Sequence, residues 1–380
     1  MRGTSLISAY TNVVMTRLSC VGSRGTLLAA FTLSFCAVQA APVYEVVQIG
    51  NLPGFESGEP MAINNQNVVV GNSYAPGVAK GWMFTENGGM TSFGVFPNLD
   101  LIVRDVNNQG QAGGYYEGWN EAFRGQPGLL AGYNGPVGFP RTDAWGLNNL
   151  NQMVGWATDA DNRERALRFN LDWTTTLLPS IAPGVDTRAR RVNDAGVAVG
   201  YSGERAVLWT ANNTLVDLHA MLPGAVVSRA GDINQAGWVT GYFQTAQNRL
   251  FGFTFNFEVG ATVVHPAGQD ELLVLRAINN QGQTVGISRS GFDSGKFEAS
   301  ASFNGVDTVL LNNLIDPNSG WDLTEAHDIN DNGYIVGRGR FQGVEANYML
   351  KPVPEPATMT ALALGLAAVV KRRRRDRVTR

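Results

Sequence analysis

Cysteine and charge are both scarce in this sequence. The 380 residues contain two cysteines, and charged residues make up only 16% of the chain, against about a quarter in an average protein. So few charges argue against a coiled coil, a helix bundle and an acidic disordered tail. Both cysteines, Cys20 and Cys36, lie near the N-terminus. A mature chain that lacks this segment would have no disulfide and no thiol chemistry, and a chain of this length can be stabilised by its core alone.

Common catalytic and metal-binding motifs are missing as well. No Gly-x-Ser-x-Gly elbow occurs. The three histidines, His219, His265 and His327, lie far apart and do not have the spacing of metal ligands. From its motifs, the sequence therefore predicts no catalytic residue, no cofactor and no metal site.

Basic residues are concentrated at the two ends of the chain. Residues 41–370 contain 19 Lys and Arg against 31 Asp and Glu. Such an acidic body would repel phosphate groups, and nucleic-acid binding needs a basic surface. A nucleic-acid partner is therefore not expected.

Residues 1–40 have the pattern of a secretory signal peptide. Arg17 and Arg24 precede an apolar run over 27–38, and Ala40 is a small residue at the expected cleavage point. The run is too short to span a bilayer. We expect secretion, with translation beginning at either Met1 or Met15.

Residues 351–380 have the pattern of a sorting signal. A Pro-Glu-Pro sequence is followed by an apolar stretch over 357–370 and then by Lys371 and an arginine cluster, which fits the cytoplasmic side of a membrane. The residues concerned are Pro354, Glu355, Pro356, Arg372, Arg373, Arg374 and Arg375. An ordinary tail anchor is the alternative, although anchoring does not require Pro-Glu-Pro.

This segment resembles the PEP-CTERM sorting domain of Gram-negative bacteria. The resemblance implies an exosortase-like membrane protease as partner, which cuts near Pro-Glu-Pro. It also implies transient inner-membrane anchoring by residues 357–370, then a cell-surface or extracellular location in a bacterium that makes exopolysaccharide.

A ten-residue pattern recurs seven times in the body of the chain, at steps of 41 to 51 residues. Each copy has an apolar residue, an asparagine, a Gly or Asn three residues later, and a closing glycine. The asparagines are Asn64, Asn107, Asn148, Asn193, Asn234, Asn279 and Asn330. Each copy is typical of a β-hairpin whose turn the asparagine side chain bonds. We expect these asparagines to be turn architecture and not ligand contacts.

The repeats predict an all-β fold, a seven-bladed β-propeller over residues 41–350. Four short strands in about 44 residues is typical of one blade. Residues 43–49 look like an unpaired fourth strand, which would complete the seventh blade and close the ring. An open β-solenoid is the alternative.

The repeats also resemble the HAF family of extracellular repeats, whose units combine an Asn-Asn-x-Gly stretch with a His-Ala-Phe-like segment. The family implies an exported protein and no established reaction. This chain departs from the family where the histidine would stand, at Lys80, Glu121, Arg165, Arg205, Arg249, Ala299 and Glu345.

Three of the decapeptides begin with aspartate, at Asp105, Asp232 and Asp328, and resemble the start of an EF-hand loop. They lack the glutamate that such a loop carries at its twelfth position. A partial calcium site that includes backbone carbonyls stays open.

Two function classes that involve a ligand or substrate remain, beside a structural spacer that binds no ligand. The first is a non-catalytic surface protein that binds exopolysaccharide or a protein partner, with Tyr115, Tyr116 and Trp119 as candidates for stacking on sugar rings. The second is a propeller glycoside hydrolase or lyase, which needs two carboxylates that converge. Candidates are Asp159, Asp161, Glu164, Asp293 and Glu298.

The sorting hypothesis predicts that alanines in place of Pro354, Glu355 and Pro356 abolish surface placement in the host bacterium, because the protease would no longer recognise its site. Cell fractionation and surface labelling measure the effect. Unchanged release and location of the variant would contradict the hypothesis.

Overall fold

The computed structural model describes residues 43–94, 100–118, 120–133, 135–264, 272–290 (only the backbone of Ser290) and 295–353. The chain divides into two units, Met1–Ala40 and Ala41–Arg380. The predicted signal peptide and the sorting residues from Pro354 onward lie outside the described residues.

The described residues form an all-β structure, as the sequence predicts. Strands β1 to β28 are accompanied only by two short 3-10 helices, η1 (His219–Met221) and η2 (Leu311–Leu314). Hydrogen bonds join the strands into five sheets, three with four strands and two with eight. Each eight-stranded sheet consists of two antiparallel sets of four, joined at one parallel bridge, Lys80 to Leu101 or Leu250 to Leu272.

The sets follow one another along the chain. The first three are β2 (Ser57–Ile63), β3 (Val69–Ala75), β4 (Val78–Thr85), β5 (Gly89–Ser92); β6 (Leu101–Val106), β7 (Ala112–Tyr116), β8 (Glu121–Gln126), β9 (Leu129–Tyr133); and β10 (Arg141–Leu147), β11 (Met153–Thr158), β12 (Glu164–Phe169), β13 (Thr175–Leu177). The next three are β14 (Thr187–Val192), β15 (Ala198–Ser202), β16 (Arg205–Trp209), β17 (Leu215–Asp217); β18 (Ala225–Ile233), β19 (Val239–Thr245), β20 (Leu250–Asn256), β21 (Gly260–Val264); and β22 (Leu272–Ile278), β23 (Thr284–Ser290), β24 (Lys296–Ser302), β25 (Val309–Leu310).

The last set combines the two ends of the described chain. It contains β26 (Trp321–Ile329), β27 (Ile335–Phe341), β28 (Val344–Val353) and β1 (Val43–Ile49). Strand β1 pairs antiparallel with β28 from Val43–Val353 to Ile49–Asn347, so the expected pairing of residues 43–49 with the last strands is observed. Because β1 holds it along its length, β28 continues past the boundary that we placed at residue 350.

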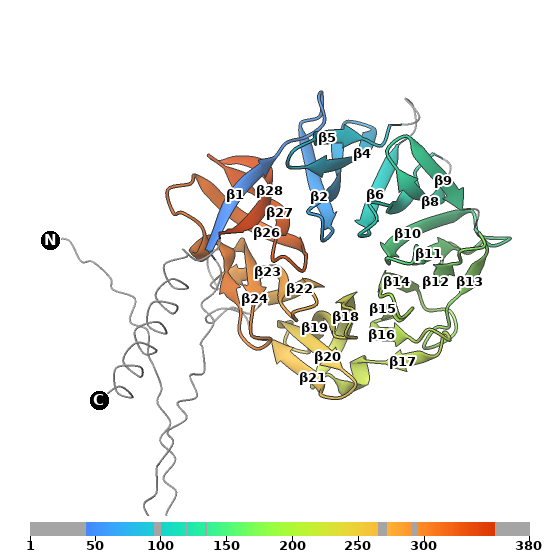
Figure 1. Cartoon of the computed structure of the whole chain (residues 1–380). Coiled ribbons are helices and arrows are strands. Elements are labelled where there is room, and N and C mark those ends of the chain that lie inside the picture. Colours follow the sequence, from blue (N-terminus) through green and yellow to red (C-terminus); the bar gives the residue numbers. More distant parts are fainter. Residues whose placement is uncertain are drawn as a thin grey trace, which may run out of the picture. The chain divides into compact units, whose positions relative to one another are not determined.

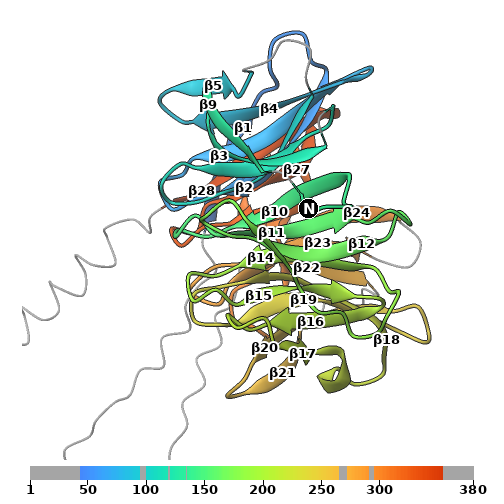
Figure 2. The same cartoon turned by 90° about the vertical axis from the view of Figure 1, so that its right-hand side faces the viewer.

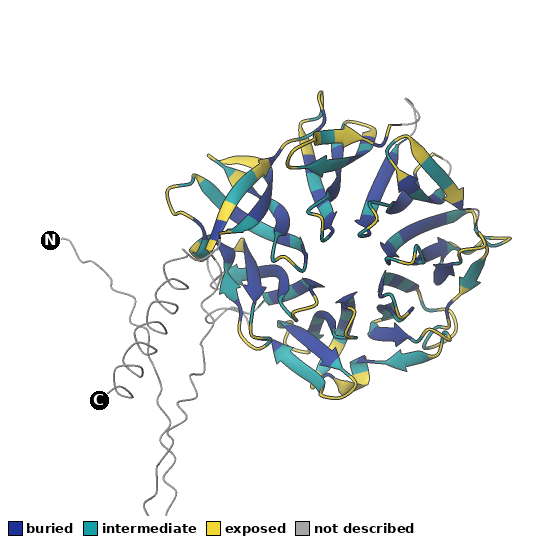
Figure 3. Ribbon diagram, viewed as in Figure 1, coloured by how far each residue is buried: buried dark blue, intermediate teal, exposed yellow. Residues whose placement is uncertain are grey.

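The sets are arranged around a common centre, and the first strand of each lies nearest to that centre (Figure 1). Seen from the side, the strands of neighbouring sets are stacked (Figure 2). Buried residues concentrate where sets face each other (Figure 3). One core cluster, for example, joins Val70 of β3, Val103 of β6 and Phe123 of β8. The core is therefore a series of layers between adjacent sets.

Every first strand contains a register shift in its pairing with the second strand. In the third set the shift falls between Ala144 and Gly146, so that Trp145 has no partner on β11. The closing glycine of each decapeptide lies opposite this region. A Cβ atom at Gly155 would collide with the carbonyl oxygen of Asp143, so only glycine permits this close approach.

Candidate functional site

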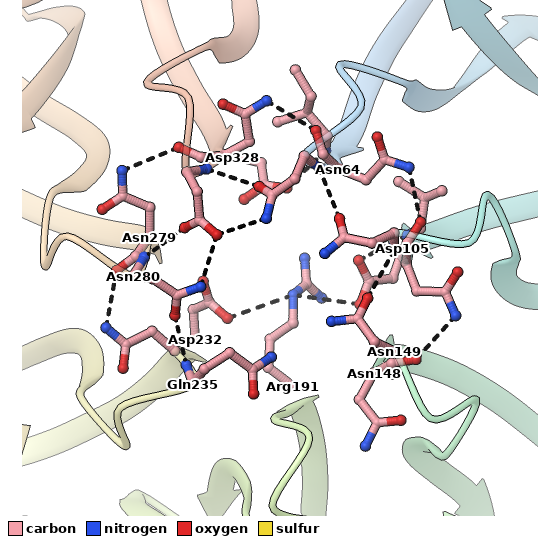
Figure 4. Close-up of a pocket in the computed structure, with 18 of the residues that line it drawn as sticks. Asn64, Asp105, Asn148, Asn149, Arg191, Asp232, Gln235, Asn279, Asn280 and Asp328 are labelled. Carbon is pink, nitrogen blue, oxygen red and sulfur yellow. Dashed lines mark hydrogen bonds and ion pairs between the residues drawn. The ribbon is translucent and has the colours of Figure 1, made fainter.

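The seven repeat asparagines form a closed cycle of hydrogen bonds, and Figure 4 shows part of it around a pocket. The side-chain Nδ2 of each donates to the main-chain oxygen of the asparagine in the next repeat. Asn64 donates to Asn107 at 2.8 Å, and Asn330 donates back to Asn64 at 2.9 Å. The five bonds between them measure 2.9 to 3.2 Å.

The side-chain oxygen of each asparagine bonds its own turn. Asn64 Oδ1 accepts from the main-chain N–H groups of Gln66 and Val68, at 3.0 and 2.9 Å. All seven asparagines are buried. Each amide therefore satisfies its hydrogen-bonding groups within the protein, both in its turn and across to the next repeat.

A second cycle runs parallel to the first. The main-chain N–H of the residue after each asparagine donates to the side-chain oxygen of its counterpart in the next repeat. The members are Asn65, Asn108, Asn149, Asp194, Gln235, Asn280 and Asp331. Asp331 N–H donates to Asn65 Oδ1 at 2.9 Å, which returns the cycle to its start.

These two cycles surround a central pocket of about 270 Å³. Four of the residues that stand two positions before a repeat asparagine line this pocket. Three of them are Asp105, Asp232 and Asp328, and a fourth is Arg191, whose Nε lies 3.9 Å from Asp105 and 3.8 Å from Asp232. The sequence did not reveal this convergence, although all four residues occupy the same position of the repeat.

Each of the three aspartates also connects two repeats. Asp328 Oδ1 accepts from the main-chain N–H of Ile329 at 2.9 Å, and its Oδ2 accepts from that of Ile63 in the first set at 2.8 Å. Asp105 and Asp232 make the equivalent pairs of bonds. Both oxygens of each carboxylate are thus engaged by main-chain donors.

Burial dominates the electrostatics of these carboxyl groups. It raises the pKa of Asp328 to about 8 and that of Asp232 to about 6, and it raises the pKa of Asp105 as well. The nearby Arg191 guanidinium and the main-chain N–H donors oppose this rise. Arg191 is the counter-charge that keeps three buried carboxyl groups in one small pocket.

The carboxylates proposed from the sequence do not gather in the pocket. Asp159, Asp161 and Glu164 form ion pairs with neighbouring arginines, such as Asp159 with Arg165 at 3.1 Å. Glu298 is buried in β24. Asp293 lies outside the described residues.

Of the three aromatic candidates for stacking on sugar rings, the structure describes Tyr115 and Tyr116. Tyr115 and Tyr116 are buried, because successive residues of β7 pack into the core on both of its sides. Trp119 lies outside the described residues.

The histidines are separated in the fold too. His219 Nδ1 lies 2.8 Å from Ser228 Oγ, and His327 Nε2 lies 3.2 Å from Glu325; His265 is not among the described residues. In the described ranges, no group of three or more His, Cys, Asp or Glu side chains is placed to hold a metal ion.

The sequence of the C-terminal segment matches a family model. Residues 352–375 match the PEP-CTERM protein-sorting motif. The motif implies export, processing by exosortase, which is a membrane protein, and a surface or extracellular location. Within the part of the chain that the structure describes, no helix is long and apolar enough to cross a membrane; the expected membrane segment, 357–370, lies outside it.

Solved structures with propeller-like folds are similar to this chain, whereas no curated protein matches it. A streptogramin B lyase has a TM-score of 0.55 at 11% identity, over 81% of this chain and 98% of the other. A virginiamycin B lyase from Staphylococcus aureus has a TM-score of 0.50 at 11% identity, over 81% and 99%. A chain of the mitotic checkpoint complex has a TM-score of 0.50 at 10% identity, over 90% and 99%. At such identities the likeness concerns the fold alone.

The central charges predict a pH-dependent stability. Because the pKa values of Asp232 and Asp328 are raised on folding, the folded chain holds protons that the unfolded chain releases, and stability falls as pH rises from about 4 through 8. We expect the Arg191→Met variant to lose about 3–5 kcal/mol at about pH 9, where the carboxyl groups are ionised, and less at about pH 5. Urea unfolding at both pH values measures this.

The matched control is Arg163→Met, which removes an arginine paired with the exposed Asp161. We expect this variant to follow the wild-type pH dependence. An equal loss for Arg191→Met at both pH values would contradict the role of Arg191 as counter-charge.

Proposed function

We propose that this protein is a surface protein sorted by exosortase. Its body is a closed seven-bladed β-propeller of HAF-like repeats. This propeller binds exopolysaccharide or a protein partner without catalysis. The single observation that carries the proposal is the sorting motif over residues 352–375. It starts at the end of β28, directly after the last repeat.

The pairing of the chain ends supports a closed ring. Strand β1 is the outer strand of the last set, and Asp328 bonds the main chain of Ile63 across the junction. In this proposal each set of four strands is one blade. A closed ring leaves fewer free strand edges at the cell surface.

The hydrogen bonds at the centre support a non-catalytic role. The seven asparagines and the three aspartates direct their polar atoms at the main chain of their own or the next repeat. In this proposal both groups are architectural, and the sites of recognition lie elsewhere on the blades.

A glycoside hydrolase or lyase that acts on matrix polysaccharide is the second candidate. The observation that favours it is the pair of buried carboxyl groups, Asp105 and Asp232, on either side of Arg191. Since both have an oxygen within 4 Å of the same Nε atom, these oxygens lie no more than about 8 Å apart, an upper bound that admits the carboxylate separations of both retaining and inverting glycosidases. Two of the similar solved structures are named as lyases.

One experiment separates the two candidates. The purified protein is incubated with exopolysaccharide from its own host, and both retention on the polymer and the release of reducing or unsaturated ends are measured. We expect retention without release. Release of sugar ends that falls by about 100-fold or more in Asp232→Asn would contradict the non-catalytic role. If the protein is not retained on the polymer, polysaccharide binding is contradicted, and a protein partner is the remaining proposal.

A further inference from the structure

The register shifts in the first strands place seven residues outside the regular pairing. These are Met61, Arg104, Trp145, Arg190, Gly231, Arg276 and His327, each three positions before a repeat asparagine. The asparagine is the same in all seven repeats, whereas this position is occupied by five different residue types. A β-bulge redirects the side chain of its extra residue and often adjoins a binding site. The fold thus requires a bulge at this position but accepts different side chains on the bulge residue.

Six of these seven residues line a second pocket of about 350 Å³. Arg191 lines both this pocket and the one bounded by the asparagines, so its side chain stands between the two. The second pocket also has walls from Arg229 and Tyr242. A volume of this size is in the range of small-ligand sites.

Arginine gives this pocket its charge, and most of its arginines have an acidic partner. Arg276 pairs with Glu325, and Arg229 pairs with Glu204, both at 3.0 Å. The carboxylate of Glu59 is engaged by the hydroxyl of Tyr74 at 2.7 Å. Glu325 and Glu204 are therefore paired with arginines, whereas Glu59, which lines the pocket, has its Oε1 on the Tyr74 hydroxyl.

Arg190 is different. Within the described ranges its side chain has neither a hydrogen bond nor an ion pair, and its Nε is buried without a partner. Its guanidinium lies between two aromatic rings, 5.2 Å from the centre of Trp145 and 5.7 Å from that of Tyr201. Burial and the nearby Arg188 and Arg191 lower the pKa of Arg190. The protein thus holds a half-buried cation against aromatic rings, and no acidic side chain among the described residues pairs with it.

We infer that this pocket binds the carboxylate of an acidic saccharide and that Arg190 is the residue that receives it. A planar guanidinium matches a carboxylate in a bidentate way. Tyr242 also lines the pocket, and an aromatic side chain suits the apolar face of a sugar ring. This inference rests on the proposed function, since it assigns to polysaccharide binding a specific pocket and a negative charge on the polymer.

Calorimetric titration of the full-length purified protein tests the assignment. The probes are D-glucuronate, D-glucose and an oligogalacturonate, with sodium sulfate as a simple anion. We expect glucuronate and oligogalacturonate to bind and glucose and sulfate to bind at least about 10-fold more weakly. In Arg190→Gln the affinity for both uronates should fall by roughly 10- to 100-fold, because a charge-assisted bond is lost.

Three comparisons keep a loss of binding from being mistaken for misfolding. Arg163→Gln removes an arginine outside the pocket and should bind like the wild type. Arg190→Lys keeps the charge and should recover part of the affinity. The melting temperature of Arg190→Gln should equal or exceed that of the wild type, since the variant removes a half-buried cation whose Nε has no partner.

Several results would overturn the assignment. One such result is that glucose or sulfate binds as tightly as glucuronate. Another is that Arg190→Gln keeps the wild-type affinity for the uronates, whether or not its melting temperature falls. If the uronates fail to bind while the host exopolysaccharide is still retained, the assignment of this pocket falls and the proposed function stands. If neither binds, polysaccharide binding as a whole falls.

Discussion

The side-chain amide of the repeat asparagine is the interaction on which the rest of this structure depends. Its oxygen closes the turn of its own hairpin, and its nitrogen bonds the main chain of the next repeat. Because seven such bonds return to their origin, the position of each hairpin is determined by both of its neighbours. The differences in repeat length, from 41 to 51 residues, do not alter this central contact.

Within each repeat, the residues that maintain the fold occupy different positions from the residues that vary in chemical character. The asparagine and the closing glycine are determined by the geometry of turn and bulge. The positions two and three residues earlier carry the residues that differ between repeats, although the aspartates two positions earlier also bond the main chain of their own and the next repeat. Arg191 and the aspartates occupy one of these positions, and Arg190 and Trp145 occupy the other. The chemical differences between the two pockets therefore arise from two positions of the repeat, two and three residues before the asparagine.

The all-β fold and the pairing of residues 43–49 with the last strands followed from the sequence, because period, turn residues and strand alternation are local signals. The convergence of Asp105, Asp232, Asp328 and Arg191 did not, because it depends on which strand faces the centre and on a bulge that shifts the register. For the same reason, Asp159, Asp161 and Glu164 looked like candidates although they pair with arginines. An alignment of the seven repeats by their asparagines contains the signal, since the three aspartates and Arg191 then share one column.

Hydrogen exchange of the turn amides measures the central claim most directly. If the cycle of asparagine bonds holds all repeats together, Asn330→Ala should lower the protection of the amide N–H groups at every turn, including that of Asn193 on the far side of the cycle. The exposed Asn318, which among the described residues bonds within its own loop to Asp316, provides the control variant Asn318→Ala, and this variant should leave protection unchanged. Loss of protection confined to the turns next to Asn330 would contradict the account.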